Sequence, residues 1–164
     1  MAVCDLLDLP TGARESAPLV GLDIGEKTIG VAVSDLSWTI ASPAGLIRRR
    51  KFTADAANLL ALCDSRTAHA LIIGLPVNMN GEEGPRCQSV RAFARHLLRL
   101  RDLPIAFWDE RLSTRAANNV LIREADISRS RRAALVDKLA ATWILQGALD
   151  RLRAARPDPT SAAR

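Results

Sequence analysis

With 164 residues, of which 48% are hydrophobic and 25% charged, the chain has an ordinary globular composition and enough length for one hydrophobic core. No apolar run reaches the roughly 18 residues of a membrane span and no secretion signal is evident, so membrane and exported proteins are not expected. The formal net charge of +5 is compatible with a nucleic-acid partner, and three widely separated cysteines indicate free thiols in the cytoplasm.

Residues 19–35 form the first strongly patterned segment and predict a β-hairpin. Two runs of small or β-branched apolar residues flank a turn that contains Gly25, Glu26 and Lys27. Residues 1–18 mix proline, glycine and polar side chains, and we expect a flexible extension there. Asp23 interrupts the first strand. Because an unpaired buried carboxylate is costly, we expect a cation, a metal ion or solvent beside it.

The rest of the chain alternates between strand and helix patterns. Residues 40–47 predict a third strand, which Pro43 confines to a sheet edge or a bulge. Thr53 is the expected N-cap of the next helix, and the apolar run at 70–74 is typical of a strand buried on both faces. A loop over 75–85 follows. Further elements are expected as a helix at 86–101, a strand at 104–108 and helices at 113–125 and 132–153, before a disordered tail at 154–164.

This order predicts an α/β fold with a mixed sheet. An antiparallel hairpin and third strand precede alternating helices and parallel strands, with helices on both faces. We expect a single domain over residues 19–153. Sites in such sheets collect at strand ends, so the residues after Leu22 and after Trp108 are candidates.

A second carboxylate in an unusual position is Asp137, in the last predicted helix. From residue 139 to residue 149 nearly every side of that helix is apolar or small, as in a deeply packed helix. Helical spacing puts Asp137 on the face of Ala140, Ala141 and Ile144. An acid on such a face needs a partner that compensates its charge.

Glu110 supplies a third carboxylate at the end of a predicted strand. Alternation lets only one of Asp109 and Glu110 point the same way as the preceding Trp108. Three such acids suit Mg²⁺, which takes oxygen ligands, and two ions about 3.5–4 Å apart support phosphodiester hydrolysis. Salt bridges to lysine or arginine would satisfy the acids equally well; the candidates are Lys27, Arg111 and Lys138.

Four segments together carry a resemblance to a known family. They are residues 21–25 with Lys27 and 30–35; residues 74–81 with Gly84 and Pro85; residues 109–114; and residues 136–141 with 144–146. In these segments, and in their order, the chain resembles the YqgF family, also called RuvX, of ribonuclease H-like pre-16S rRNA nucleases or Holliday-junction resolvases. The resemblance covers about residues 19–152.

The resemblance implies a ribonuclease H-like mixed sheet and an acidic site. Its catalytic and metal-binding residues would be Asp23, Glu110 and Asp137, with Mg²⁺ or Mn²⁺ as cofactor. The family loop over residues 75–84 implies substrate contacts, and the expected substrate-binding residues are Lys27, Asn78, Asn80, Arg111 and Lys138. The family often has aspartate at the position of Asn80, which argues against an obligatory metal ligand there.

The leading functional hypothesis is a hydrolase: a two-metal nuclease that processes the 5′ end of pre-16S rRNA in ribosome biogenesis. The expected partner is pre-rRNA, with branched DNA as the alternative, and the expected state is a cytoplasmic monomer or homodimer. A Holliday-junction resolvase would require the dimer, because it cuts two strands symmetrically. A non-catalytic RNA-binding factor on the same fold is the alternative of another class.

Overall fold

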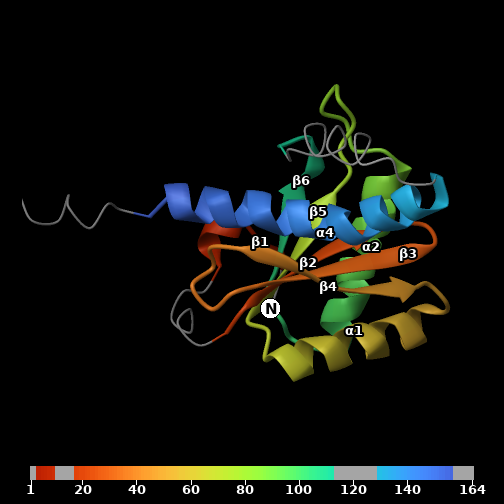
Figure 1. Ribbon diagram of the computed structural model, residues 1–164, viewed down its shortest axis with the longest axis horizontal. Coiled ribbons are helices and arrows are strands. Elements are labelled where there is room, and N and C mark those ends of the chain that lie inside the picture. The colour runs from red at the N-terminus through yellow and green to blue at the C-terminus, as the bar shows by residue number, and fades with distance from the viewer. Residues whose placement is uncertain (1–2, 10–16, 113–128, 157–164) are drawn as a thin grey trace, which may run out of the picture.

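Six strands form one mixed sheet, with helices on both of its faces (Figure 1). The computed structural model describes residues 3–9, 17–112 and 129–156, and the side chains of 129–135, 137 and 138 lie outside that description. The strands are β1 (Val3–Cys4), β2 (Leu19–Ile24), β3 (Thr28–Ser34), β4 (Ala41–Arg48), β5 (Ala70–Leu75) and β6 (Ile105–Asp109). The helices are α1 (Phe52–Arg66), α2 (Pro85–Leu100) and α4 (Arg129–Ala154), with short 3-10 turns at Leu6–Asp8 and Glu110–Leu112.

The strand order is β1-β6-β5-β2-β3-β4. Strands β2, β3 and β4 form the antiparallel part, and β2, β5, β6 and β1 pair in parallel. The predicted hairpin is confirmed, with the Gly25 amide donating to the Thr28 carbonyl at 2.9 Å. The prediction for Pro43 is also confirmed: β4 is an edge strand, and its register with β3 shifts beside Pro43.

Strand alternation divides the core into two layers. One layer lies between the sheet and helices α1 and α2, and includes Leu22, Ile24 and Ile73. The other lies between the sheet and α4, and includes Ile72 and Trp108. Figure 1 shows α4 lying across its face of the sheet. The α/β class and the placement of helices on both faces are therefore as predicted.

Helix α4 approaches strand β2 so closely that there is no room for a side chain at Gly21. A Cβ at that position would lie 2.7 Å from Leu145 Cβ and 3.1 Å from the Ala141 carbonyl oxygen. Close packing of this kind requires small residues on both partners. It holds the α4 backbone against the strand that carries Asp23, and it accounts for the small-residue face of the helix.

Three sequence-based expectations need correction. Residues 3–9 are part of the domain and not an extension, because β1 pairs with β6 and Leu6 and Leu9 are buried. Helix α1 begins at Phe52, so Thr53 lies in its first turn; the Lys51 carbonyl accepts the first helical amide bonds. Helix α4 begins at Arg129, earlier than predicted.

Some expectations fall on parts of the chain that the structure does not describe. The helix predicted over 113–125 lies outside the described residues, as does most of the predicted tail, from residue 157 onward. Among the helices that are described, none is both long enough and apolar enough to cross a membrane.

Candidate active site at the carboxyl end of the sheet

Asp23 and Glu110 lie at the same end and on the same face of the sheet. Strands β2, β5 and β6 are parallel neighbours, so their carboxyl ends meet at one edge. Alternation along β2 puts Asp23 on the side of Gly21, which packs against α4. Glu110 follows β6 directly and opens a short 3-10 turn. Both carboxylates are half-buried.

Gly74 in the central strand β5 provides the space that the Glu110 carboxylate occupies. A Cβ built on Gly74 would lie 2.7 Å from Glu110 Oε1 and would also meet Ile144 of α4. Leu22 pairs with Ile73, so Asp23 continues the register beside Gly74. The Glu110 side chain thus reaches over β5, from the β6 side toward the strand that carries Asp23.

Asp137 belongs to α4, one helical turn before Ala141, which contacts Gly21. Its side chain and that of Lys138 lie outside the described part of the structure, so their predicted roles stay predictions. Among the side chains that are described, no three acids, histidines or cysteines gather into a group of metal-binding size.

The donors that are described nevertheless fit a hard divalent cation. Asp23 and Glu110 offer carboxylate oxygens, and Mg²⁺ is commonly held by one or two carboxylates, with water and substrate phosphate as its remaining ligands. The room above Gly74 keeps the Glu110 carboxylate over the sheet. Mg²⁺ or Mn²⁺ therefore suits the chemistry of these residues better than a metal that prefers thiolate ligands.

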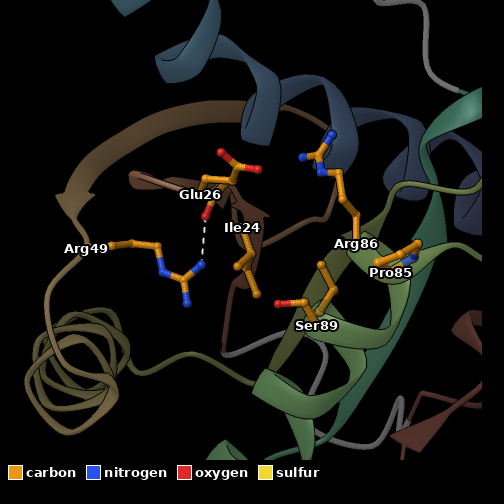
Figure 2. Close-up of a pocket in the computed structure, with 8 residues that line it drawn as sticks. Ile24, Glu26, Arg49, Pro85, Arg86 and Ser89 are labelled. Carbon is orange, nitrogen blue, oxygen red and sulfur yellow. Dashed lines mark hydrogen bonds between the residues drawn. The ribbon is translucent and has the colours of Figure 1, made fainter.

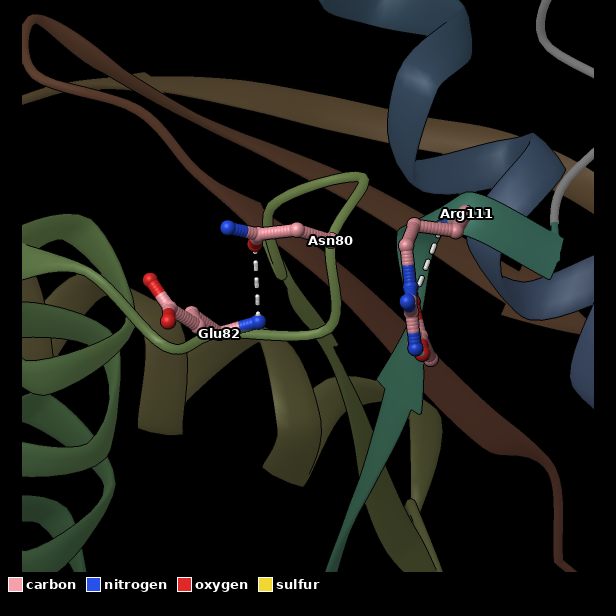
Figure 3. Close-up of polar contacts among 4 residues, drawn as sticks. Asn80, Glu82 and Arg111 are labelled. Atoms are coloured by element: carbon pink, nitrogen blue, oxygen red, sulfur yellow. Dashed lines mark hydrogen bonds and ion pairs between the residues drawn. The ribbon is translucent and has the colours of Figure 1, made fainter.

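Asp109 is turned away from this pair and holds Arg111. Its carboxylate accepts hydrogen bonds from Arg111 Nε at 3.0 Å and from Nη2 at 2.6 Å, and from the Arg111 backbone amide at 2.9 Å (Figure 3). The side-chain hydrogen bond from Arg111 lowers the pKa of Asp109, and the same bond raises the pKa of Arg111. The guanidinium is thereby fixed next to Gly81 of the neighbouring loop.

The loop between β5 and α2 is a compact turn that carries Asn78 and Asn80. The Asn78 backbone amide donates to the Glu82 backbone carbonyl at 3.0 Å, and Gly81 closes the turn with a φ of +88°. The Asn80 side-chain oxygen accepts from the Glu82 amide at 3.0 Å (Figure 3). Asn80 therefore helps to build the loop, and its amide nitrogen is left as the donor toward a ligand.

Arg49 supports the turn beside Asp23, a role that sequence reasoning missed. Its Nη1 donates to the Gly25 carbonyl at 2.8 Å (Figure 2). Its backbone amide donates to the Lys27 carbonyl, also at 2.8 Å. Asp55 is buried behind Arg49, with Oδ2 4.0 Å from Arg49 Nε. In sequence Arg49 is one of four consecutive cations, and nothing local distinguishes it from its neighbours.

Comparison with known proteins identifies close relatives. A protein of Phenylobacterium zucineum named "Putative pre-16S rRNA nuclease" is 68% identical over 93% of this chain and 99% of its own length. One of the same name from Rhodospirillum rubrum is 55% identical over 96% of this chain and 98% of its own length.

Among solved structures, Thermus thermophilus RuvC in complex with a Holliday junction substrate matches with a TM-score of 0.52. The match covers 87% of this chain and 99% of that chain at 13% identity, so it shows a shared fold. The model of the RuvX family, described as Holliday junction resolvase, matches residues 17–151. This match covers most of the chain, and the chain therefore belongs to the RuvX family.

Proposed function

We propose that this chain is a metal-dependent nuclease that hydrolyses phosphodiester bonds, and that its substrate is the 5′ end of pre-16S rRNA in the cytoplasm. The names of its close relatives support the substrate. The observation that carries the proposal is the placement of two half-buried carboxylates, Asp23 and Glu110, on one face at the carboxyl end of the sheet, with Gly74 leaving room between them.

In this proposal Asp23, Glu110 and Asp137 hold Mg²⁺ or Mn²⁺. When bound, such an ion polarises a phosphate oxygen and lowers the pKa of a coordinated water. The backbone packing of α4 against Gly21 brings the helix that carries Asp137 close to Asp23. The half-buried setting limits water around the carboxylates, which strengthens their hold on a cation.

Other residues of the chain position the substrate. Arg111 presents a guanidinium that Asp109 already orients, and an oriented guanidinium matches the geometry of a phosphate. Lys27 and Lys138 supply further positive charge, and Asn78 and Asn80 supply amide donors. Such contacts fix the register of a nucleic acid without reading its sequence.

Cleavage assays on two substrates test the proposal. Labelled pre-16S rRNA and a four-way DNA junction are each incubated with the full chain in Mg²⁺, Mn²⁺ or EDTA. The variants are Asp23→Asn, Glu110→Gln and Asp137→Asn. Asp8→Asn is the matched control, because Asp8 is an exposed acid in the short 3-10 turn Leu6–Asp8, an element that carries none of these three residues. Mn²⁺ binding without substrate, measured by calorimetry, gives a readout independent of activity.

We expect metal-dependent RNA cleavage that survives Asp8→Asn and is lost in the other three variants, together with Mn²⁺ binding. Cleavage that persists in EDTA and in Asp23→Asn would refute a metal nuclease. Junction cleavage without RNA cleavage would assign branched DNA as the substrate, which the description of the family model favours. RNA binding by the wild-type chain with no cleavage would indicate a non-catalytic RNA-binding factor.

A further inference from the structure

A hollow of about 240 Å³ lies beside the turn between β2 and β3, on the α2 side of the sheet. Its floor includes Ile24 and Val90, which belong to the core layer under α1 and α2. Its walls carry Arg49, Arg86 and Ser89 (Figure 2). Ile24 directly follows Asp23, so the hollow adjoins the candidate active site across the end of one strand.

We propose that this hollow binds a backbone phosphate of the nucleic acid a few nucleotides from the cleaved bond. The inference rests on the proposed nuclease function and adds a substrate subsite to it. Two guanidinium groups and a hydroxyl offer several hydrogen-bond donors around one apolar floor. Arginine presents its donors in a planar fork that fits phosphate oxygens, and its charge is permanent.

Arg49 is held in place before any ligand arrives. The Gly25 carbonyl accepts from its Nη1 at 2.8 Å, and the buried Asp55 carboxylate lies behind its Nε. Asp55 is itself fixed, because its Oδ1 accepts from the Arg50 backbone amide at 2.9 Å. With its side chain 27% exposed, Arg49 keeps part of the guanidinium open to the hollow. A donor oriented in advance loses less conformational entropy on binding.

Arg86 is the second cation of the hollow and is exposed. Within the described part of the chain, no acidic side chain pairs with it. Arg91, further along the same helix, pairs with Glu83 at 2.6 Å. Arg86 is therefore available to an anionic ligand, whereas Arg91 is already neutralised by an acid.

The surrounding charge continues the site toward β4. A neighbouring hollow of about 500 Å³ shares Glu26 and Arg49 and adds Lys27 and Arg48. Among the residues that line the two hollows, Glu26 is the only acid, and Figure 2 places it at the rim opposite Arg86. The net charge of the side chains around the turn is therefore positive. A strand bound at Asp23 would follow this turn onto the α2 side of the sheet.

Binding measurements in EDTA test the subsite separately from catalysis. The full chain is titrated with labelled RNA at 50 and 200 mM salt, comparing Arg86→Gln and Ser89→Ala with Arg95→Gln. Arg95 is an exposed arginine of the same helix, and nine residues of helix put it about 180° around the axis from Arg86. Both arginine variants remove one charge, so only the location differs. Circular dichroism checks that each variant is folded.

We expect Arg86→Gln, and not Arg95→Gln, to reduce the magnitude of the salt slope by about 0.7. The ratio of the RNA affinities of Arg95→Gln and Arg86→Gln should therefore change about 2.6-fold between 50 and 200 mM salt, as expected for the loss of one phosphate contact. Ser89→Ala should also lower the affinity for RNA, and Glu26→Gln should raise it. Neutral methylphosphonates placed at successive positions should weaken wild-type binding at each contacted phosphate, including one position a few nucleotides from the cleaved bond. At that position Arg86→Gln should be less sensitive than the wild-type chain, because only Arg49 and Ser89 still face the phosphate.

Equal salt slopes for Arg86→Gln and Arg95→Gln, or an unchanged methylphosphonate profile in Arg86→Gln, would overturn the subsite while leaving the nuclease proposal standing. Wild-type cleavage in Mg²⁺ is measured in parallel on the same RNA and on a DNA junction. If the wild-type chain binds and cleaves neither, the proposed function fails and the subsite fails with it.

Discussion

Replacing Gly74 with alanine adds a methyl group where the Glu110 carboxylate crosses β5. The new Cβ would lie 2.7 Å from Glu110 Oε1 and 3.1 Å from Ile144 Cγ1. Both neighbours belong to side chains that are able to rotate, so we expect the lower part of the usual cost of overpacking, about 1–2 kcal/mol of unfolding free energy. For a chain of this size, that corresponds to a fall in Tm of about 2–8 °C.

The effect on activity should be much larger than the effect on stability. The methyl group displaces the carboxylate of Glu110, and a displacement of about 1 Å at a reacting centre can cost about 100-fold in rate. We therefore expect kcat/KM for RNA cleavage to fall about 100-fold. Mn²⁺ affinity, measured by calorimetry without substrate, should fall by about 10-fold or more.

A second substitution separates the two collisions. Ile144→Val removes Cδ1, one of the Ile144 atoms that the new methyl group would meet, but does not alter the approach to Glu110. Gly74→Ala combined with Ile144→Val should therefore regain thermal stability relative to Gly74→Ala but keep its reduced kcat/KM, with Ile144→Val alone as the control. Unchanged Mn²⁺ affinity and cleavage in Gly74→Ala would refute the reasoning, and so would recovery of activity in the double variant.

Three further predictions follow from individual contacts. Arg111 lowers the pKa of Asp109, so the stability that this ion pair contributes is present at neutral pH and is lost as the pH falls below about 3.9. Asp109→Asn should therefore reduce the free energy of unfolding at pH 7 by less than about 1 kcal/mol, seen as a slightly lower Tm. In strong acid the variant and the wild-type chain should have the same Tm. Burial raises the pKa of Cys63 to about 11, so iodoacetamide at pH 8 should label this thiol only after unfolding, as mass spectrometry would show. The contribution of the buried thiol to stability should decline above about pH 8.5, where the unfolded chain begins to lose the proton, as thermal melts would show. Asn80→Ala removes the acceptor of the Glu82 amide, whose hydrogen exchange should accelerate about fivefold, whereas Asn80→Asp keeps an acceptor and should leave the exchange rate unchanged.

Local periodicity was enough to predict most of the sheet. The hairpin over residues 19–35 and the buried strand at 70–74 each carry their own pattern, and the structure has strands in both places. Strand β1 has two residues, too few to show a period, and its pairing depends on the exposed edge of β6. The start of α1 is set by the Lys51 carbonyl and not by the cap preference of Thr53.

The residues of the candidate site likewise divide into those that local sequence reveals and those whose role depends on contacts distant in sequence. Asp23 was detectable because a charge inside an apolar strand is a local misfit. The importance of Gly74 was not, because it depends on Glu110, a residue distant in sequence whose carboxylate crosses that strand. Arg49 is likewise indistinguishable from Arg48 and Arg50 in sequence. Only the packed turn shows which of the three holds the Gly25 carbonyl.

Strand β1 covers part of the outer edge of the sheet. It pairs with Ile105 and Ala106 of β6, a strand that is rich in apolar and aromatic side chains. An uncovered edge of that kind presents unpaired amides and carbonyls to the strands of other molecules and promotes aggregation. Removal of residues 3–9 would therefore be expected to reduce the yield of monodisperse protein, even though none of these residues belongs to the candidate site.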